Sequence, residues 1–328
     1  MANNDKFKLF DRVVVHVGER QSDEEDSFSV LQFNTLARCN ATTKAFPKVP
    51  AIYLDWKYRY QLLFNEIFLR EPDFACLQEV DERFKGQLED ACLMSRESPW
   101  AGLDNSYSCV YIPKKDKREG IMIIHKRKYE IVECSALHHA DIDGVKQNQV
   151  SVLCVFSFLS KRGHTKLKSI VSLVVAHLKS KAEFATTRLS QGKDILEKIE
   201  NWMFSNPHPL IIAGDFNAEP DEDVMEEFTK AGFKSSYCIG GHNHPDFTSF
   251  KYKEDREQLR TIDYILHNEY ARPVQILEIP TRNRLQGHDG RFTEHVGLPS
   301  YTYPSDHVAL FTRFAVKKPA PENIASSS

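Results

Sequence analysis

The stretch LIIAGDFN at residues 210–217 places an apolar run directly before an acid and an amide. The branched aliphatic residues are typical of a buried strand, so Asp215 and Asn217 would stand at its end. The same arrangement recurs at five other places in the chain. There, the polar residues that follow or interrupt apolar runs are Asn34; Glu79 with Asp81; His177 with Lys179 and Lys181; Asp263; and Asp306 with His307. Because strand ends share a crevice in α/β folds, these residues predict one polar site.

Strand-like runs rich in Val, Ile, Phe and Tyr recur along the whole chain. We predict ten strands, at residues 28–33, 74–78, 107–112, 121–125, 150–158, 169–176, 210–213, 261–266, 274–279 and 308–314. The spacing of apolar residues predicts helices at 55–70 and 182–204, and a third helix at 221–231 ends at Gly232. Ten strands are too many for a simple doubly wound sheet. The sequence therefore predicts an α/β protein with two packed sheets and helices outside them.

The composition is that of an ordinary globular protein and excludes several broad classes. Of the 328 residues, 41% are hydrophobic and 27% are charged, which excludes a collagen-like or wholly disordered chain. The net charge is −3, which argues against a protein that binds nucleic acid over a broad basic face. This balance still allows a local basic pocket around a small anion.

No apolar stretch is long enough to span a bilayer, and residues 1–20 mix acids with bases, unlike a secretory signal or a transit peptide. We therefore expect a cytoplasmic protein without a membrane span, and a longer isoform with a mitochondrial targeting segment stays open. The seven cysteines are scattered and form no CxxC pair. We expect buried thiols rather than a disulfide framework or a zinc site.

The polar residues at the strand ends suit the hydrolysis of phosphate esters. Carboxylate and amide oxygens are ligands for Mg²⁺, and such a reaction also needs an oriented water and cationic or histidine donors. Singly, each residue has a plainer explanation: Asn34 could form a turn, Glu79 and Asp81 could cap a helix, the 215–217 segment could be a turn, and Asp263 could be a structural ion-pair partner. Together they favour a shared site. The chain lacks the G-x-S-x-G, P-loop and G-x-G-x-x-G motifs of other enzyme classes.

Six motifs, in order, resemble those of the endonuclease/exonuclease/phosphatase superfamily. They are FNTLA at 33–37, LQEVD at 77–81, AHLK at 176–179, GDFNAEP at 214–220, TIDYI at 261–265 and YPSDH at 303–307. The resemblance implies a four-layer α/β sandwich with the site at one rim of the two sheets. It implies a single catalytic domain at 28–316, after a variable segment at 1–27 whose acidic part, 21–27, should be mobile or exposed. We expect residues 317–328 to form a disordered tail.

The resemblance also implies a role for each residue of the site. Glu79 would be the principal Mg²⁺ ligand with Asn34 beside it, Mn²⁺ being a possible substitute, and Asp306 would be a ligand for a second metal. Asp215 would orient or deprotonate the attacking water, and Asn217 would help to bind the phosphoryl group. His307, paired with Asp263, would hold or protonate phosphate oxygens, and His177 would contact the same group.

Within the superfamily the chain is similar to the deadenylase-like branch, and most of all to the nocturnin family. HLKSK, RTIDYI and LPSYTYPSDH carry this closer match. It implies removal of the 2′-phosphate of NADP(H), with poly(A) trimming by a 3′–5′ exoribonuclease as the alternative. The basic pocket would hold Lys114, Lys179, Lys181 and Lys253. Lys181 and Lys253 stand where the family pattern has Arg, and Lys lacks the bidentate fork of Arg.

A third hypothesis is a catalytically silent binding protein that keeps the fold. It predicts the loss of residues at the metal and His–Asp positions, whereas every such position holds the residue that the chemistry needs. The sequence leaves protein partners open.

Overall fold

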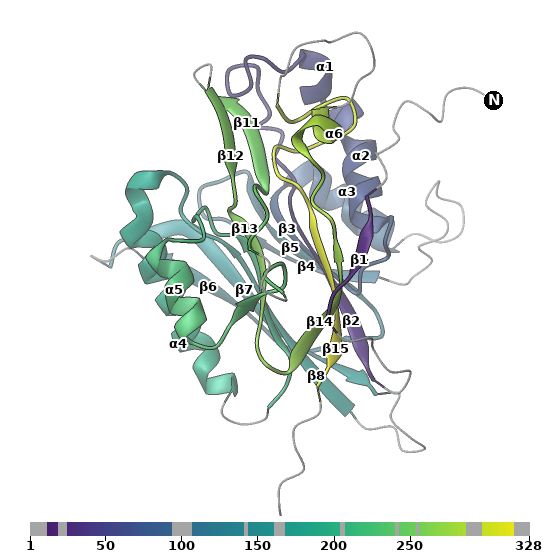
Figure 1. Ribbon diagram of the computed structural model, residues 1–328, viewed down its shortest axis with the longest axis vertical. Helices are drawn as coiled ribbons and strands as arrows, with labels where there is room; N and C mark the ends of the chain where they lie inside the picture. Colours follow the sequence, from purple (N-terminus) through teal and green to yellow (C-terminus); the bar gives the residue numbers. More distant parts are fainter. Residues whose placement is uncertain are drawn as a thin grey trace, which may run out of the picture.

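The protein folds into two mixed β-sheets that pack face to face, with helices on the outer face of each sheet (Figure 1). The computed structural model describes residues 12–18, 25–93, 107–140, 144–160, 168–203, 207–239, 243–253, 256–286 and 297–317. The layers run helix, sheet, sheet, helix, which confirms the predicted four-layer α/β sandwich in a single domain.

The first sheet has seven strands in the order β1-β14-β15-β2-β3-β5-β4. Their bounds are β1 Val14–His16, β14 Ala271–Leu277, β15 Leu310–Val316, β2 Ser27–Asn34, β3 Phe74–Asp81, β5 Glu119–Lys126 and β4 Tyr107–Pro113. Strands β2 and β3 run parallel, and the other neighbours are antiparallel. Asn34 and Glu79 therefore lie at the same edge of this sheet.

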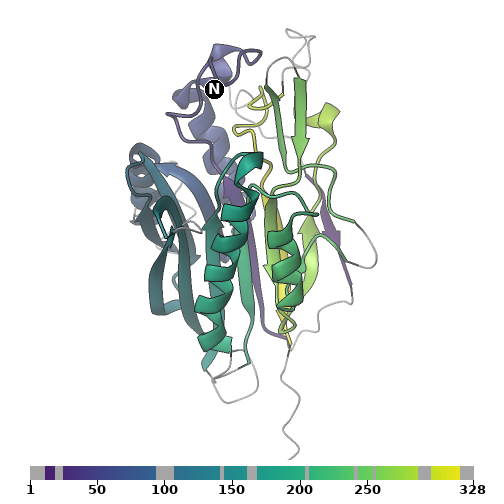
Figure 2. The ribbon, with the colours of Figure 1, turned by 90° about the vertical axis from the view of Figure 1, so that its left-hand side faces the viewer.

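The second sheet has six strands in the order β10-β13-β9-β8-β7-β6. Their bounds are β10 Lys234–Ser235, β13 Asp263–His267, β9 Leu210–Asp215, β8 Lys168–His177, β7 Lys146–Leu159 and β6 Glu130–Ala140. Strands β8 and β9 run parallel, so both end at the same edge, and β13 begins there because it is antiparallel to β9. A separate hairpin, β11 Ser249–Lys253 and β12 Arg256–Arg260, extends beyond the sheets at the end where α1 Ala51–Leu54 lies (Figures 1 and 2).

Helices α2 Trp56–Phe68 and α3 Glu82–Leu93 cover the first sheet, and α4 Ala185–Met203 and α5 Asp223–Lys230 lie side by side over the second (Figure 2). A 3₁₀ turn, η2 Ala182–Phe184, precedes α4, and the short helix α6 Arg282–Gln286 follows β14. Asp55 begins α2 by accepting a hydrogen bond from the Lys57 amide at 2.8 Å. Each helix pair thus closes one outer face of the sandwich.

Three apolar cores separate the four layers. The central core joins the facing sides of the two sheets and contains Val30, Cys76, Val152, Leu173 and Ile211. One outer core packs α2 and α3 on the first sheet, and the other packs α4 and α5 on the second. Because both faces of the middle strands are covered, those strands are continuously apolar rather than alternating.

The ten predicted strands and three predicted helices all overlap elements of the structure, although Phe204 lies outside the described residues. The prediction missed strands β1, β6, β10, β11 and β12 and helices α1, α3 and α6. Strand β6 has one face open to solvent and carries Glu130, Glu133 and His138, so its apolar signal is weak. The structure supports the helix-cap interpretation of Asp81, whose Oδ1 accepts hydrogen bonds from the Arg83 and Phe84 amides at 3.0 and 3.1 Å.

Two expectations from the sequence need correction. Cys134 and Cys154 form a disulfide instead of remaining thiols, because they lie opposite each other on the antiparallel strands β6 and β7. The other five cysteines are free; Cys76 and Cys92 are buried, as expected, whereas Cys109 and Cys238 are half-buried and Cys39 is exposed. The acidic segment 21–27 was expected to be mobile or exposed, and its residues 21–24 lie outside the described residues. Asp26, however, is buried: its carboxylate accepts a hydrogen bond from the Ser160 hydroxyl, and its backbone carbonyl accepts one from the Val316 amide.

Segment 12–18 also packs onto the domain. Strand β1 pairs with β14, and Arg12 is buried in an ion pair with Glu66 at 2.7 Å. Of the predicted tail, only Lys317 is described, and residues 318–328 lie outside the described part. Among the described helices, none combines the length and the apolar character that a membrane crossing requires.

Candidate active site

The predicted strand-end residues converge at one rim of the sandwich. Asn34 ends β2, His177 ends β8 and Asp215 ends β9. Asp263 begins β13 opposite Asp215, and His177 is the parallel partner of the same residue. Glu79 lies near the end of β3 at a bulge, with a positive φ of 56°. The two sheets therefore contribute to a single cluster, as the sequence predicted.

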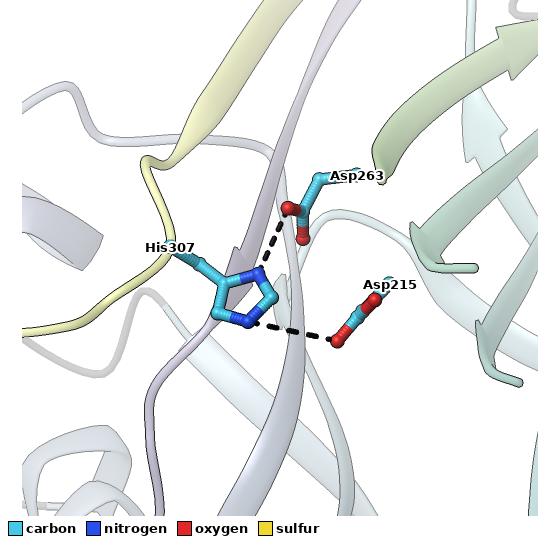
Figure 3. A group of neighbouring side chains, drawn as sticks. All are labelled: Asp215, Asp263 and His307. Carbon is cyan, nitrogen blue, oxygen red and sulfur yellow. Dashed lines mark hydrogen bonds and ion pairs between the residues drawn. The ribbon is translucent and has the colours of Figure 1, made fainter. Parts of the chain in front are cut away.

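His307 lies between two carboxylates at the centre of the cluster (Figure 3). Its Nδ1 is 2.9 Å from Oδ2 of Asp263, and its Nε2 is 3.8 Å from Oδ2 of Asp215. Asp263 is held in turn by Thr248, which donates to Oδ2 at 2.8 Å, and by Gln32, which donates to Oδ1 at 3.2 Å. All these side chains are buried, so the imidazole orientation is fixed.

The charges around His307 favour its protonated form. Burial alone would lower its pKa, but Asp263, Asp215 and Asp306 outweigh burial and raise the pKa to about 10. Burial raises the pKa of Asp215, and the positive charge of His307 opposes that rise. The pair therefore presents an imidazolium donor beside a carboxylate that is a stronger base than an exposed aspartate.

His177 has the opposite character. Burial lowers its pKa well below the usual value, and the nearby Lys114 and His307 lower it further, so its ring is neutral. Lys114 Nζ lies 2.8 Å from Nδ1 of His177 and 3.0 Å from Oε1 of Glu119. Because an ammonium only donates, Nδ1 accepts and the ring proton is on Nε2. That nitrogen lies 3.6 Å from Oδ2 of Asp215.

Asn34 and Glu79 form the oxygen-rich side of the cluster. Asn34 Nδ2 donates to Oδ2 of Asp215 at 2.9 Å and to Oε1 of Glu79 at 3.3 Å. The other oxygen of Glu79 accepts from the Ala37 amide at 3.0 Å and from Asn40 Nδ2 at 2.7 Å. The Glu79 and Asp215 oxygens are the hard donors that Mg²⁺ and Mn²⁺ prefer, so the carboxylates present fit such an ion. The Asn34 oxygen accepts from the Leu36 amide at 3.0 Å, so Asn34 would bind the ion with its side-chain amide turned over.

Asp215, Asp263 and His307 also bring three potential ligand atoms within 4.8 Å of one another. Both nitrogens of His307 face carboxylates, and the raised pKa of His307 keeps them protonated. A protonated imidazole has no lone pair for a metal. The side with Glu79 and Asn34 is therefore the better candidate for a metal position.

Asp306, predicted as a ligand for a second metal, is paired with a lysine. Lys251 Nζ lies 3.0 Å from Oδ2 of Asp306, and the carboxylate is buried. Burial raises the pKa of Asp306, but Lys251 and His307 outweigh it and the net shift is downward. The sequence analysis did not predict Lys251, because only the pairing of β11 with the segment around His307 brings it into the site.

The remaining predicted residues lie at increasing distance from the cluster. Asn217 is buried, donates from its amide to Oδ1 of Asp215 at 3.0 Å, and has its side chain on the Leu178 carbonyl at 3.2 Å. Lys179 is half-buried beside Gln147 and Phe184. The Lys181 side chain is 69% exposed and pairs with Glu183, and Lys253 is exposed at the end of β11. Of the four predicted lysines, only Lys114 contacts the central cluster.

Arg59 holds two backbone segments of the site together, and the sequence analysis did not predict it. It lies fully buried on α2 and donates to the carbonyls of Thr35, Leu36 and Pro304, each at 2.6 Å. Burial lowers its pKa to about 10. A single charge within an amphipathic helix carries no motif, so no local signal distinguishes Arg59 from an exposed arginine. It joins the loop after β2 to the segment before His307.

A family model described as "Endonuclease/Exonuclease/phosphatase family" matches residues 31–307. The chain is 29% identical over 311 residues to nocturnin from Xenopus laevis, covering 90% of this chain and 74% of that protein. It is 28% identical to nocturnin from Homo sapiens, covering 87% of this chain and 64% of the relative. The CCR4-Not complex 3′-5′-exoribonuclease subunit Ccr4 from Candida albicans is 24% identical over 91% of this chain and 42% of its own length.

Two solved structures share the fold. The human nocturnin catalytic domain with bound sulfate superposes with a TM-score of 0.66 at 23% identity, covering 93% of this chain and 97% of that chain. ANGEL2, a 2′,3′-cyclic phosphatase in complex with adenosine-2′,3′-vanadate, gives a TM-score of 0.70 at 17% identity, covering 94% of this chain and 100% of that chain. Both likenesses extend over nearly the whole chain, which agrees with a single domain.

Proposed function

The chain belongs to the endonuclease/exonuclease/phosphatase family and is a hydrolase of phosphate esters, and we propose that its reaction is the removal of the 2′-phosphate of NADP(H). The observation that carries the proposal is the compact set of hydrogen-bond donors beside Asp215, two of which, His307 and Lys114, are cations. His307, His177 and Lys114 form one short chain of contacts around it, which suits a single phosphoryl group. A long RNA strand would instead call for an extended basic and aromatic track.

Glu79 and Asn34 would hold a divalent ion, Mg²⁺ or in its place Mn²⁺. When bound, the ion would supply Lewis-acid stabilisation of the phosphoryl oxygens. Asp215 would orient the attacking water and take its proton, since the raised pKa of Asp215 makes it a better base than an exposed aspartate. The water oxygen forms a bond to phosphorus as the bond from phosphorus to the 2′ oxygen breaks. The 2′ oxygen takes up a proton, which balances the one that Asp215 accepts from the water, and the products are NAD(H) and inorganic phosphate.

The two histidines would donate hydrogen bonds to the phosphoryl group. His307, held by Asp263 and charged at neutral pH, would donate to the phosphoryl oxygens and neutralise the charge that develops on them. His177 would donate from Nε2 to the same group, because Lys114 occupies its other nitrogen. Asn217 would complete the donors. These are roles that the contacts support for each side chain.

The outer lysines would bind the rest of the dinucleotide. Lys179 is half-buried and Lys181 and Lys253 are exposed, so their charges would be available to the pyrophosphate of a dinucleotide. A lysine binds phosphate as a point charge without a fixed fork, so each of these contacts would contribute less than an arginine. We also place the activity in the cytoplasm, on the ground of the five free cysteines; the Cys134–Cys154 disulfide is the feature against it.

The second candidate is a 3′–5′ exoribonuclease that trims poly(A) with the same site. It is favoured by the similarity to the Candida albicans exoribonuclease subunit, which extends over 91% of this chain. Attack on a terminal phosphodiester needs the same base, donors and metal, so the catalytic groups serve either reaction, and the surface that binds the rest of the substrate decides between them.

The test compares the two substrates directly. Purified protein is incubated with NADPH and, separately, with an end-labelled oligo(A), each with Mg²⁺ and with EDTA, and both inorganic phosphate and RNA length are measured. Mg²⁺-dependent release of phosphate with intact RNA is the expected result. RNA shortening without phosphate release would replace the proposal with the exoribonuclease, and inactivity on both would move the search to other phosphate esters.

A further inference from the structure

The pair formed by Lys251 and Asp306 lies beside the metal position and is part of the built site. Two strand-like hydrogen bonds fix it: the Phe250 amide donates to the Asp306 carbonyl at 2.8 Å, and the Val308 amide donates to the Thr248 carbonyl at 2.7 Å. Ser249 pairs with His307 between them. Strand β11 is thus attached to the 306–308 segment, and Lys251 is brought onto Asp306 by backbone register rather than by chance.

The ammonium group of Lys251 is surrounded by negative charge. Asp306 is its contact at 3.0 Å, and Glu79 and Asp215 also raise the pKa of Lys251, after Asp306, as acids nearby do. About a third of the lysine side chain, 34%, remains exposed, whereas only 4% of the Asp306 side chain does. The lysine is therefore less buried than the carboxylate it pairs with, and it adds a positive charge beside the acidic cluster.

We propose that Lys251 takes the place of a second metal ion in this active site: it occupies Oδ2 of Asp306 and limits the site to one divalent ion, held at Glu79 and Asn34. This inference rests on the proposed metal-dependent function and adds a residue to it. With Nζ 3.0 Å from Oδ2 and an Mg²⁺–oxygen distance of about 2.1 Å, an ion on Oδ2 of Asp306 would lie no more than about 5 Å from Nζ, and an ion on Oδ1 no more than about 7 Å. Two cations so close repel each other in a buried site.

One oxygen of Asp306 remains available for a different contact. Its Oδ1 is buried and has no hydrogen-bond partner among the described residues. Without the ammonium, both oxygens of a buried carboxylate would lack compensation, which favours the recruitment of a divalent ion. The charge of Lys251, rather than its bulk, is what would exclude that ion.

The test counts bound ions without relying on turnover. Mn²⁺ is titrated into the wild type and the variants, and free Mn²⁺ is followed by electron paramagnetic resonance. We expect one bound Mn²⁺ that excess Mg²⁺ displaces in the wild type. Lys251→Arg keeps the charge and should also bind one ion, whereas Lys251→Met keeps only the apolar stem and should bind two. Lys251→Met with Asp306→Asn should return to one ion, because the recruiting carboxylate is removed.

The outcomes separate this inference from the proposed function. Two ions in the wild type, or a single ion in a folded Lys251→Met protein, would overturn the role of Lys251 and leave the metal-dependent hydrolase intact. Absence of any bound ion in the wild type would overturn the metal-dependent function and this inference with it. If Lys251→Met does not fold, the same comparison is made with Lys251→Gln, and the wild-type count remains decisive.

Discussion

At the scale of single residues, the site is organised by charges held in direct contact. His307 faces a carboxylate with each ring nitrogen, Lys114 fixes the tautomer of His177, and Lys251 neutralises Asp306. Neighbouring histidines consequently differ in charge at neutral pH: His307 carries a proton on both nitrogens and His177 on one. Such opposed protonation states are what an acid–base reaction needs from two groups of the same kind.

The pH dependence of hydrolysis should report the His307–Asp263 pair. Because the pKa of His307 is raised to about 10, its charged form persists through neutral pH and is lost as pH rises through that value. Activity should fall there. In Asp263→Asn the carboxylate that favours the imidazolium is gone, so the alkaline limb should move down by about 1–3 pH units. The measurement is initial rate against pH.

Asp90→Asn is the matched control for that profile. Asp90 is exposed near the end of α3, away from the end of the helix that follows β3, so its profile should equal that of the wild type. An alkaline limb that stays in place in Asp263→Asn would contradict the assignment of the raised pKa to this pair.

The sequence could predict the residues that stand in motifs and not those that act from elsewhere. Each of three site residues lies next to a recognisable apolar run: Glu79, Asp215 and His307. Strand ends meet at a shared crevice in α/β folds, so the place of such residues can be predicted. Arg59 and Lys251 are single charges within a helix and a hairpin, and tertiary contacts alone give them a role.

At the scale of elements, the parallel strands β8 and β9 approach each other closely at Gly214, and this contact positions Asp215. A Cβ atom on Gly214 would lie 2.2 Å from the Ala176 carbonyl oxygen, which is a backbone atom and cannot move aside without disturbing β8. His177 follows Ala176 and Asp215 follows Gly214, so the same contact sets the spacing of two site residues.

Gly214→Ala should therefore lower the free energy of unfolding by about 3 kcal/mol and reduce hydrolysis strongly. Gly86→Ala is the control: no atom lies within 4 Å of a Cβ at that position in α3, and replacing a helical glycine should raise stability by about 0.5–1 kcal/mol. Urea unfolding of both variants measures the difference. Equal stabilities would contradict the close approach.

Arg59 makes a second element-scale prediction, because it links the loop after β2 to the segment before His307. Arg59→Met would leave three buried carbonyls without their donor and should cost about 3 kcal/mol of stability. Arg83→Met, at an exposed position on α3, should cost little. Comparable losses in the two variants would show that Arg59 does not support the site.

Elements with a continuous apolar run were predictable, and elements at edges were not. Strands such as β9 are covered on both faces and read as unbroken hydrophobic segments. Strand β11 alternates lysines with aromatic residues, and β6 is open to solvent along one face, so neither run stands out from a loop. Because β6 was missed, the facing position of Cys134 and Cys154 could not be foreseen.

At the scale of the whole molecule, two sheets bring carboxylate and amide side chains from distant parts of the chain to one rim. Asn34, Glu79, Asp215 and Asp306 come from segments separated by dozens of residues, and the central core holds the sheets in register. The number of strands indicated two sheets. Their order did not follow from the sequence, since it depends on pairing between segments far apart in the chain.

A bound divalent ion should stabilise the whole fold. Glu79, Asp215 and Asp306 lie close together, and a cation that binds only the folded state shifts unfolding by mass action. At a Mg²⁺ concentration about 100 times the dissociation constant, we expect a gain of about 2.7 kcal/mol in the free energy of unfolding. Unfolding with Mg²⁺ and with EDTA measures it, and an unchanged value would contradict a bound ion.

The central claim is that this rim hydrolyses a phosphate ester with a metal held by Glu79. Its most direct test is the Mg²⁺-dependent release of phosphate from NADPH by the wild type, Glu79→Gln and the exposed control Glu82→Gln, at matched folding. We expect Glu82→Gln to equal the wild type and Glu79→Gln to be slower by a factor on the order of 10³. Full Mg²⁺-dependent turnover in a folded Glu79→Gln protein would contradict the account.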